Sequence, residues 1–366
     1  MEHIAIDLGG RKSQICVRGS DGEILEEKSH PTALLGEYLA KRPQSRVIVE
    51  TCSEAFHVAD QALALGHEAR VVPATLVREL GVGARRTKTD RRDAAKLSEV
   101  SCRIDLPSVH IPSTKSRERK RLCGARDRLV SARTLLINNV RGWLRTVGSP
   151  LKKVSSESFP RRLRQACEEE GRAIPSEIER ELLVIEVLNK QIAEADKDVR
   201  CEAKADPVSH RLMTVPGVGP VTSVRFLAAV DNVSRFPSAH AVESYFGLVP
   251  GENSSSERQQ RTSITKAGST ALRAVLIQAA WSAWRCAATD PMVIWAKEVA
   301  KRRGVRIAIV ALARKIVGIL YAMWRDGAAY EAKRSSDVVI AEEPSEEAII
   351  ALLSTGSQIH SVKTQT

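Results

Sequence analysis

The sequence has few cysteines and no long apolar run that is free of charge. Its seven cysteines are scattered over 366 residues without a Cys-x-x-Cys pair, which predicts reduced thiols in a cytoplasm and gives no zinc signature. The most apolar late stretch, residues 305–324, is interrupted by three basic residues, which argues against a membrane-spanning helix. The first residues contain no basic leader followed by an apolar run, so no signal peptide is expected.

Positive charge is what the chain has in excess. It carries 56 Lys and Arg against 44 Asp and Glu, a formal net charge of +12. Such a balance favours a polyanionic partner, and nucleic acid is preferred here over a membrane surface. The length and the hydrophobic content of 43% are those of a globular protein with two or three domains.

Residues 1–106 alternate short apolar strands with helices, and turn residues separate them. The expected strands are 3–8, 13–18, 23–28, 46–49 and 68–72. The expected helices are 32–40, 53–64 after a Ser53 N-cap, 75–81 and 91–102. The order βββαβαβα, opened by a three-strand meander, predicts an α/β domain of the ribonuclease-H-like class.

Four acids fall where such a fold brings distant parts of the chain together. Asp7 ends the first strand, Glu50 ends the fourth, and Asp90 and Asp93 share one face at the start of the last helix. If strands one and four are neighbours, the four carboxylates converge at one end of the sheet. Such a cluster suits two divalent cations that stabilise the attacking and leaving oxygens of a phosphodiester displacement. The alternatives are local: strand-end and helix-start acids that cap turns or complement a helix dipole.

Basic residues crowd around the last of these helices and are expected to contact a nucleic-acid backbone. They are Arg85, Arg86, Lys88, Arg91 and Arg92. Carboxylates for a metal inside a basic collar suggest an enzyme that acts on nucleic acid.

Residues 107–206 are highly charged and predicted to be helical. Apolar residues recur there at three- and four-residue steps, which indicates a long antiparallel helical hairpin or a dimerising coiled coil. The first series is Leu122, Ala125, Leu129, Ala132, Leu136, Val140 and Trp143, and the second is Ile185, Leu188, Ile192, Ala195 and Val199.

Residues 207–330 form a third, mostly helical unit with two notable segments. The turn at 212–222 is similar to that of a helix-hairpin-helix motif, in which Gly217 and Gly219 would let backbone N–H groups reach a DNA phosphate; an ordinary tight turn between helices is the alternative. The loop at 251–261 holds three consecutive serines, which are either nucleophiles activated from elsewhere in the fold or a flexible linker. The cations near these serines are Arg258, Arg261 and Lys266. Residues 331–366 turn acidic and predict a mobile tail.

Several short motifs, in this order, resemble one family. They are Ile6-Asp7-Leu-Gly, Val49-Glu50, the Lys-Thr-Asp-Arg-Arg-Asp-Ala run at 88–94, Thr-Val-Pro-Gly-Val-Gly at 214–219, Tyr-Phe-Gly-Leu-Val-Pro at 245–250 and Ile-Thr-Lys-Ala-Gly at 264–268. The combination is similar to the DEDD transposases of bacterial insertion sequences, the insertion-sequence one-hundred-and-ten and eleven-eleven group. The resemblance covers the chain up to about residue 325.

The resemblance implies more than the residues alone do. It implies a RuvC-like N-terminal domain, a coiled-coil region and a C-terminal transposase domain with a catalytic serine. Such proteins are DNA recombinases of the bacterial cytoplasm and nucleoid, guided by a non-coding bridge RNA and assembled as dimers or tetramers, without a membrane partner. Asp7, Glu50, Asp90 and Asp93 match the family's Mg²⁺ ligands, and the serine five residues after Pro250 is Ser255.

The match is not complete at the serine loop. The family usually has glycine where this chain has Ser256 and Thr262, and their absence reduces backbone freedom. The choice among Ser254, Ser255 and Ser256 as the nucleophile therefore stays open.

Three other functions are compatible with parts of the sequence. Residues 4–10 also resemble the first phosphate loop of sugar kinases and actin-like ATPases, although no second such loop follows. A non-catalytic architectural DNA-binding protein would use only the helices and the charge. A metal-dependent nuclease or junction resolvase would use the four acids without a serine step.

Overall fold

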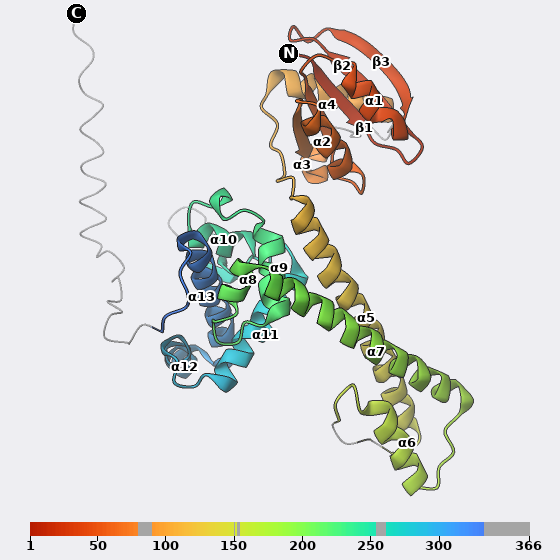
Figure 1. Ribbon diagram of the computed structural model, residues 1–366, viewed down its shortest axis with the longest axis vertical. Helices are drawn as coiled ribbons and strands as arrows, with labels where there is room; N and C mark the ends of the chain where they lie inside the picture. The colour runs from red at the N-terminus through yellow and green to blue at the C-terminus, as the bar shows by residue number, and fades with distance from the viewer. Residues whose placement is uncertain (80–89, 150, 152–153, 254–260, 333–366) are drawn as a thin grey trace, which may run out of the picture. The chain divides into compact units, whose positions relative to one another are not determined.

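The computed structural model describes residues 1–79, 90–149, 151, 154–253 and 261–332, apart from the side chains of 77–79, 90 and 261. The chain forms two compact units, Met1–Thr114 and Lys115–Thr366 (Figure 1). The division near residue 206 stays a prediction, and the predicted tail lies outside the described residues from 333 onward.

The first unit is built on a five-stranded mixed sheet with the order β3-β2-β1-β4-β5. Its strands are β1 (His3–Asp7), β2 (Lys12–Arg18), β3 (Ile24–Pro31), β4 (Arg46–Glu50) and β5 (Glu68–Val72). β1 pairs antiparallel with β2 and parallel with β4, so strands one and four are neighbours as predicted. This mixed sheet is compatible with a ribonuclease-H-like domain.

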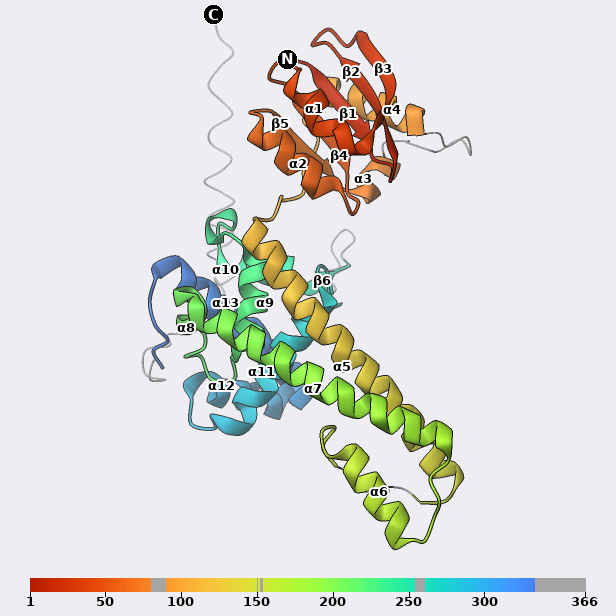
Figure 2. The same ribbon diagram turned by 45° about the vertical axis from the view of Figure 1, so that its right-hand side comes forward.

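Helices cover both faces of the sheet because alternate strand residues are apolar on each side. Ile4 and Ile6 pack against α1 (Leu35–Ala40), which follows the short helix η1 (Thr32–Leu34), and against α2 (Ala55–Ala64). Ala5 and Ile48 instead pack against α4 (Asp90–Arg103) on the other face (Figure 2). The short helix α3 (Ala74–Glu79) follows β5.

The predicted start of the second helix is wrong by two residues. α2 begins at Ala55, and its N-cap residue is Glu54 rather than Ser53, with no side-chain capping bond. The chain first continues along the sheet edge, where the Thr51 N–H donates to the carbonyl oxygen of Val72 at 2.9 Å. Those extra residues delay the turn into the helix.

The second unit begins with two long antiparallel helices, α5 (Thr114–Thr146) and α7 (Ser176–Ala205), which lie side by side in Figures 1 and 2. The shorter α6 (Phe159–Glu169) packs at their far end. This confirms the predicted antiparallel hairpin. In α7 the predicted positions Ile185, Ile192 and Val199 are buried.

In α5 the buried seam lies one residue away from most of the predicted positions. Cys123, Ile137 and Leu144 are buried, whereas Leu122, Leu136 and Trp143 are only half-buried and Ala132 is exposed. The reason is a set of arginines at heptad spacing that occupies the seam and pairs with polar residues of α7 and of the α5–α6 connection. Arg119 bonds Glu202 at 2.7 Å, Arg126 bonds Asp196, and Arg133 bonds Asn189 at 2.9 Å and Glu157 at 3.0 Å. Apolar periodicity alone does not detect a seam whose charges are paired.

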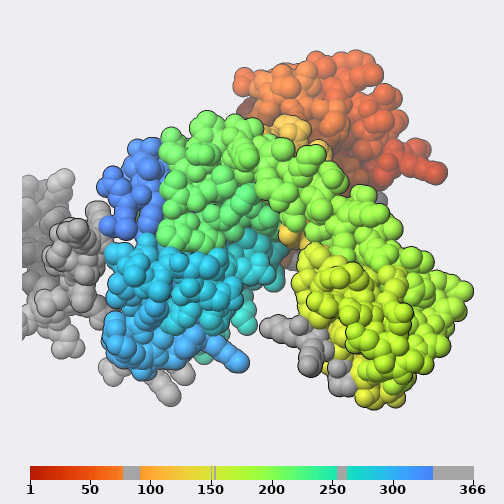
Figure 3. Space-filling view, turned by 60° about the horizontal axis from the view of Figure 1, so that its bottom comes forward, coloured from red at the N-terminus to blue at the C-terminus, as the bar shows by residue number. Residues whose placement is uncertain are grey.

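The remaining helices of the second unit surround one apolar core. They are α8 (Pro207–Leu212), α9 (Pro220–Val230), η2 (Val233–Arg235), α10 (Ala239–Tyr245), α11 (Thr270–Cys286), α12 (Pro291–Arg303) and α13 (Val305–Asp326). Figure 3 shows one outer face of this part of the chain, in green to blue. A short hairpin joins β6 (Pro250–Glu252) to β7 (Arg261–Ile264). Within the described part of the chain, α13 alone is long and apolar enough to cross a membrane, yet half of that apolar window is buried inside the protein.

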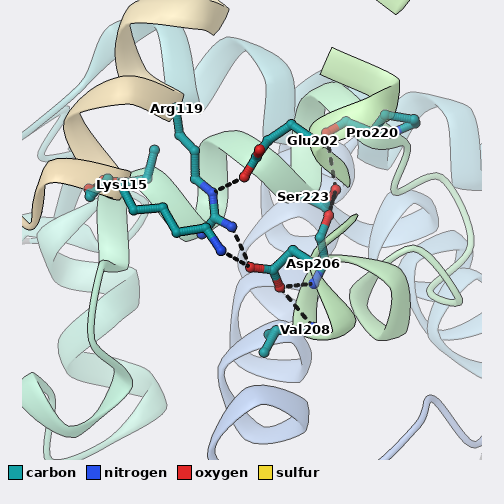
Figure 4. Close-up of polar contacts among 10 residues, drawn as sticks. Lys115, Arg119, Glu202, Asp206, Val208, Pro220 and Ser223 are labelled. Atoms are coloured by element: carbon teal, nitrogen blue, oxygen red, sulfur yellow. Dashed lines mark hydrogen bonds and ion pairs between the residues drawn. The ribbon is translucent and has the colours of Figure 1, made fainter. Parts of the chain in front are cut away.

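An ion-pair network fixes the joint between α7 and α8 (Figure 4). Asp206 caps α8 by accepting hydrogen bonds from the N–H groups of Val208 and Ser209, and it also pairs with Arg119 and Lys115 of α5. Burial would raise the pKa of Asp206, but the hydrogen bond from Ser209 and the charge of Arg119 outweigh it and lower the pKa to about 2.

Replacement of Asp206 by alanine should lower the free energy of unfolding by roughly 3 kcal/mol, because it removes the cap and leaves the buried Arg119 with Glu202 but without its second carboxylate partner. Urea denaturation at neutral pH measures this loss. The pKa of Asp206 is depressed in the folded state, so its contribution is present above about pH 4 and is lost as the pH falls through about 2. Asp198→Ala, at an exposed position of α7, is the matched control and should change stability by less than about 0.5 kcal/mol. Equal effects of the two variants would contradict this role.

Candidate active site at the carboxyl edge of the sheet

Two of the predicted acids lie next to each other at the ends of neighbouring strands. The parallel register pairs Ile6 of β1 with Val49 of β4, so Asp7 and Glu50 follow as the next pair. Adjacent strands are about 4.8 Å apart. Ala5 and Ile48 face α4, and side chains two residues further along a strand point to the same side, so both carboxylates face α4 as well.

The third acid, Asp93, comes from α4. The later part of this helix is fixed to the sheet where Ser101 bonds the ring of His3 at 2.8 Å and Ser98 donates to the Cys16 sulfur at 3.1 Å. From the Ser101–His3 contact, the eight residues back to Asp93 span about 12 Å along the helix, and the four residues from His3 to Asp7 span about 13 Å along the strand. Asp93 therefore lies at about the same level of the sheet as Asp7.

Burial supports this placement of Asp93. Its exposed fraction is 4%, and Leu97, one turn later, packs between Ala5 and Ile48. A buried carboxylate is unfavourable unless hydrogen bonds or a cation compensate its charge. Carboxylate oxygens from three elements are a donor set that fits a hard divalent cation.

The predicted fourth acid, Asp90, opens α4, and its side chain lies outside the described part. Among the described residues, no group of three or more His, Cys, Asp or Glu is close enough to hold a metal ion. Register and packing place Asp7, Glu50 and Asp93 on the face of the sheet that α4 covers. Their convergence on one cation, and the complete four-acid set, stay predictions.

The predicted basic collar is described only at Arg91 and Arg92. Both are exposed, and Arg91 pairs with Glu27 of β3 through an Nε–Oε2 contact of 3.0 Å. The remaining members, Arg85, Arg86 and Lys88, lie outside the described residues.

In the second unit, two motifs that are distant in sequence meet at the base of the β6–β7 hairpin. Thr265 donates to the carbonyl oxygen of Val249 at 2.9 Å, and Lys266 donates to that of Gly247 at 3.1 Å. Gly247 has a φ of +68°, and a Cβ there would lie 2.3 Å from the Ala267 nitrogen, so only glycine permits the contact. Residues 254–260, with the three serines and Arg258, lie outside the described part between these strands, and Arg261 begins β7 without a described side chain.

Packing against α11 explains one of the two glycines in the turn between α8 and α9. Gly217 has a φ of +85°, and a Cβ there would lie 2.2 Å from the carbonyl oxygen of Ala279 on α11. Gly219 is the N-cap residue of α9, and nothing lies within 4 Å of its Cβ position. The observed role of Gly217 is therefore a close approach between helices.

Family comparisons agree with both units. Residues 4–148 match a model of DEDD transposases of the IS110 type, and residues 209–292 match the model described as the transposase IS116/IS110/IS902 family. Together the two matches cover more than half of the chain. The chain belongs to the IS110 family of transposases.

Alignments with relatives of this transposase span most of both chains. The transposase for insertion sequence element IS1111A of Coxiella burnetii is 27% identical over 87% of this chain and 88% of its own. A probable family 20 transposase of Pseudomonas aeruginosa is 27% identical over 88% of this chain and 96% of its own. The IS110-family transposase is thus an enzyme that cuts and rejoins DNA.

The two glycines of the α8–α9 turn make a matched test in the transposase. Gly217→Ala should destabilise the protein by roughly 2–4 kcal/mol, since alanine is strained at positive φ and overlaps α11. Gly219→Ala should cost less than about 1 kcal/mol, because its site is open and its φ of −101° suits alanine. Thermal unfolding measures both, and similar losses would contradict the packing role.

The sequence patterns did not predict a cavity in the second unit of the transposase. Arg273, Trp281 and Arg306 meet there from α11 and α13. Trp281 belongs to a mostly apolar helix, and Arg306 is one of the three basic residues that interrupt the apolar stretch 305–324, so neither pattern predicts a cavity. An arginine at the start of an apolar helix was the available signal.

Proposed function

We propose that this transposase cuts and rejoins DNA through a serine nucleophile, Ser255, together with Mg²⁺ held by Asp7, Glu50, Asp90 and Asp93 in a RuvC-like domain. The observation that carries the proposal is that Asp7 and Glu50 directly follow the in-register pair Ile6 and Val49, on the face of the sheet covered by the helix that holds the buried Asp93. Ser255 is supported by the contact between the motifs at 245–250 and 264–268, which holds the two ends of its segment together.

The chemical step balances without an external energy source. The Ser255 oxygen attacks the phosphorus and gives up its proton, a phosphoserine ester forms, and the bond to one deoxyribose oxygen breaks as that oxygen takes up a proton. Attack by another strand's hydroxyl on the ester reverses the sequence and releases the serine. When bound, Mg²⁺ would lower the negative charge at the reacting phosphate. The four acids would hold the cation, and the arginines and lysines around them bind the flanking nucleic-acid backbone.

Assembly and guidance are part of the same proposal. The chain works as a dimer or tetramer on donor and target DNA, guided by a non-coding bridge RNA, at the bacterial nucleoid. The net charge of +12 supports nucleic-acid partners. Exposed apolar side chains on the paired helices support a coiled-coil contact with a second copy. They are Leu135, Leu183, Val184 and Val187.

The experiment is strand exchange by the purified protein with Mg²⁺, element-end DNA and RNA transcribed from the non-coding segment beside its reading frame. Recombinant product that requires both Mg²⁺ and the RNA supports the proposal. Recombinant product formed without RNA would show that no guide RNA is required. Cleavage without rejoining would favour a metal-dependent nuclease that uses the acids alone.

A further inference from the structure

A cavity of about 540 Å³ opens on the second unit between α11, the start of α13 and the base of the β6–β7 hairpin. Its wall is mostly apolar, and the volume lies in the range of small-ligand sites. The lining residues used below are Leu248, Lys266, Ala274, Trp281, Arg306 and Ile309.

The cavity is backed by the core. Ile309 and Leu248 are each 1% exposed and belong to the central cluster of this unit, whereas Trp281 is half-buried against it. A pocket with a rigid floor and an aromatic wall suits a flat group, and nucleobases stack readily on such side chains.

The opening is positively charged. Lys266 and Arg306 are exposed, and neither forms an ion pair with another residue that the structure describes. Arg273 adds a fixed charge, because its guanidinium donates to the carbonyl oxygens of Ala267 and Gly268. None of the described residues that line the cavity is acidic. An apolar interior with a cationic rim matches the two halves of a nucleotide.

The cavity also lies at the base of the two strands that precede and follow the serine-bearing segment in sequence. Leu248 and Lys266 flank the strands β6 and β7, between which residues 254–260 run in sequence. We propose that this cavity binds one unpaired nucleotide of the nucleic-acid strand being processed, with its base against Trp281 and its phosphates at Lys266 and Arg306. The proposal rests on nucleic acid as the substrate and adds a subsite that holds a base outside the stack.

The first test compares a short fluorescein-labelled thymidine oligonucleotide with an abasic strand of equal length and charge, using Ser255→Ala protein without Mg²⁺. Ser255→Ala protein with Trp281 intact should bind the thymidine strand about tenfold more tightly than the abasic strand, which is the difference expected for one stacked base. Trp281→Ala should remove that preference and Trp281→Phe should retain most of it. Equal binding of both strands by protein with Trp281 intact would overturn the proposal.

A second pair of variants guards against misfolding. Ala274→Glu places a carboxylate at the cavity on an exposed position of α11 and should abolish the preference for bases. Ala271→Glu, an exposed position on the same helix outside the lining, should leave it unchanged. Similar behaviour of the two variants would also overturn the proposal.

Photocrosslinking identifies the bound group directly. An oligonucleotide with 5-iodouracil should crosslink to the α11 peptide that contains Trp281, and deoxyribose and ribose versions show whether the strand is DNA or RNA. Crosslinks confined to other peptides would contradict the site. Binding is measured without catalysis, so loss of this site would leave the cleavage proposal standing, and failure of Ser255 as nucleophile would leave this site standing.

Discussion

Asp93→Asn should reduce DNA cleavage by about a thousandfold or more while the protein stays folded. Asparagine keeps the size of the side chain but removes the charge that holds a divalent cation. Mutation of residues that hydrogen-bond to metal ligands typically lowers metal affinity or activity about 10–100-fold, so loss of a direct ligand should have a larger effect. Asp93 is 4% exposed, so bulk water has little access to its carboxylate.

The control for Asp93 is Glu99→Gln, the same chemical change on the same helix. Glu99 is partly exposed and pairs with Lys96 and Arg103, so its loss should leave cleavage within about threefold. Mg²⁺ should also raise the melting temperature of the wild type and of Glu99→Gln but not of Asp93→Asn, since a ligand stabilises only a fold that binds it. Cleavage by Asp93→Asn within tenfold of the wild type would exclude the carboxylate from the site.

Ser255→Ala should abolish both the covalent protein–DNA adduct and strand exchange, a loss of at least about 10⁴-fold. A missing nucleophile cannot be replaced by binding or charge alone. Denaturing gels of labelled DNA after reaction with Mg²⁺ measure the adduct, and product analysis measures exchange.

The neighbouring serines provide the matched controls. Ser254→Ala and Ser256→Ala make the same change one residue away and should retain the adduct. Loss of the adduct in one of these variants instead would move the nucleophile to that position. An adduct that survives all three substitutions would exclude the serine step and favour the nuclease alternative.

The first unit was largely predictable because its signals are local. Short apolar strands bounded by turn residues gave β1, β4 and β5 to within a residue, and the parallel neighbours β1 and β4 followed from the fold class. The position of Asp7 and Glu50 at the ends of neighbouring strands then follows, because adjacent parallel strands end at one edge. Asp93 lies on the helix that packs over that face, and the meeting of the three carboxylates stays a prediction.

Predictions failed where side-chain pairing replaced apolar periodicity. Arg119, Arg126 and Arg133 occupy the α5 seam because acceptors on α7 and in the α5–α6 connection compensate their charges, and no single-helix pattern reveals that. The cavity at Trp281 was missed for a similar reason: its walls come from α11, α13 and a hairpin, each unremarkable alone.

The most direct measurement is the anomalous scattering of Mn²⁺ bound to the crystalline protein. The account predicts a peak at the carboxyl edge of the sheet, within coordination distance of oxygens from Asp7, Glu50 and Asp93, with Asp90 completing the set. No peak at saturating Mn²⁺, or carboxylates of Asp7 and Asp93 that face separate surfaces, would contradict it.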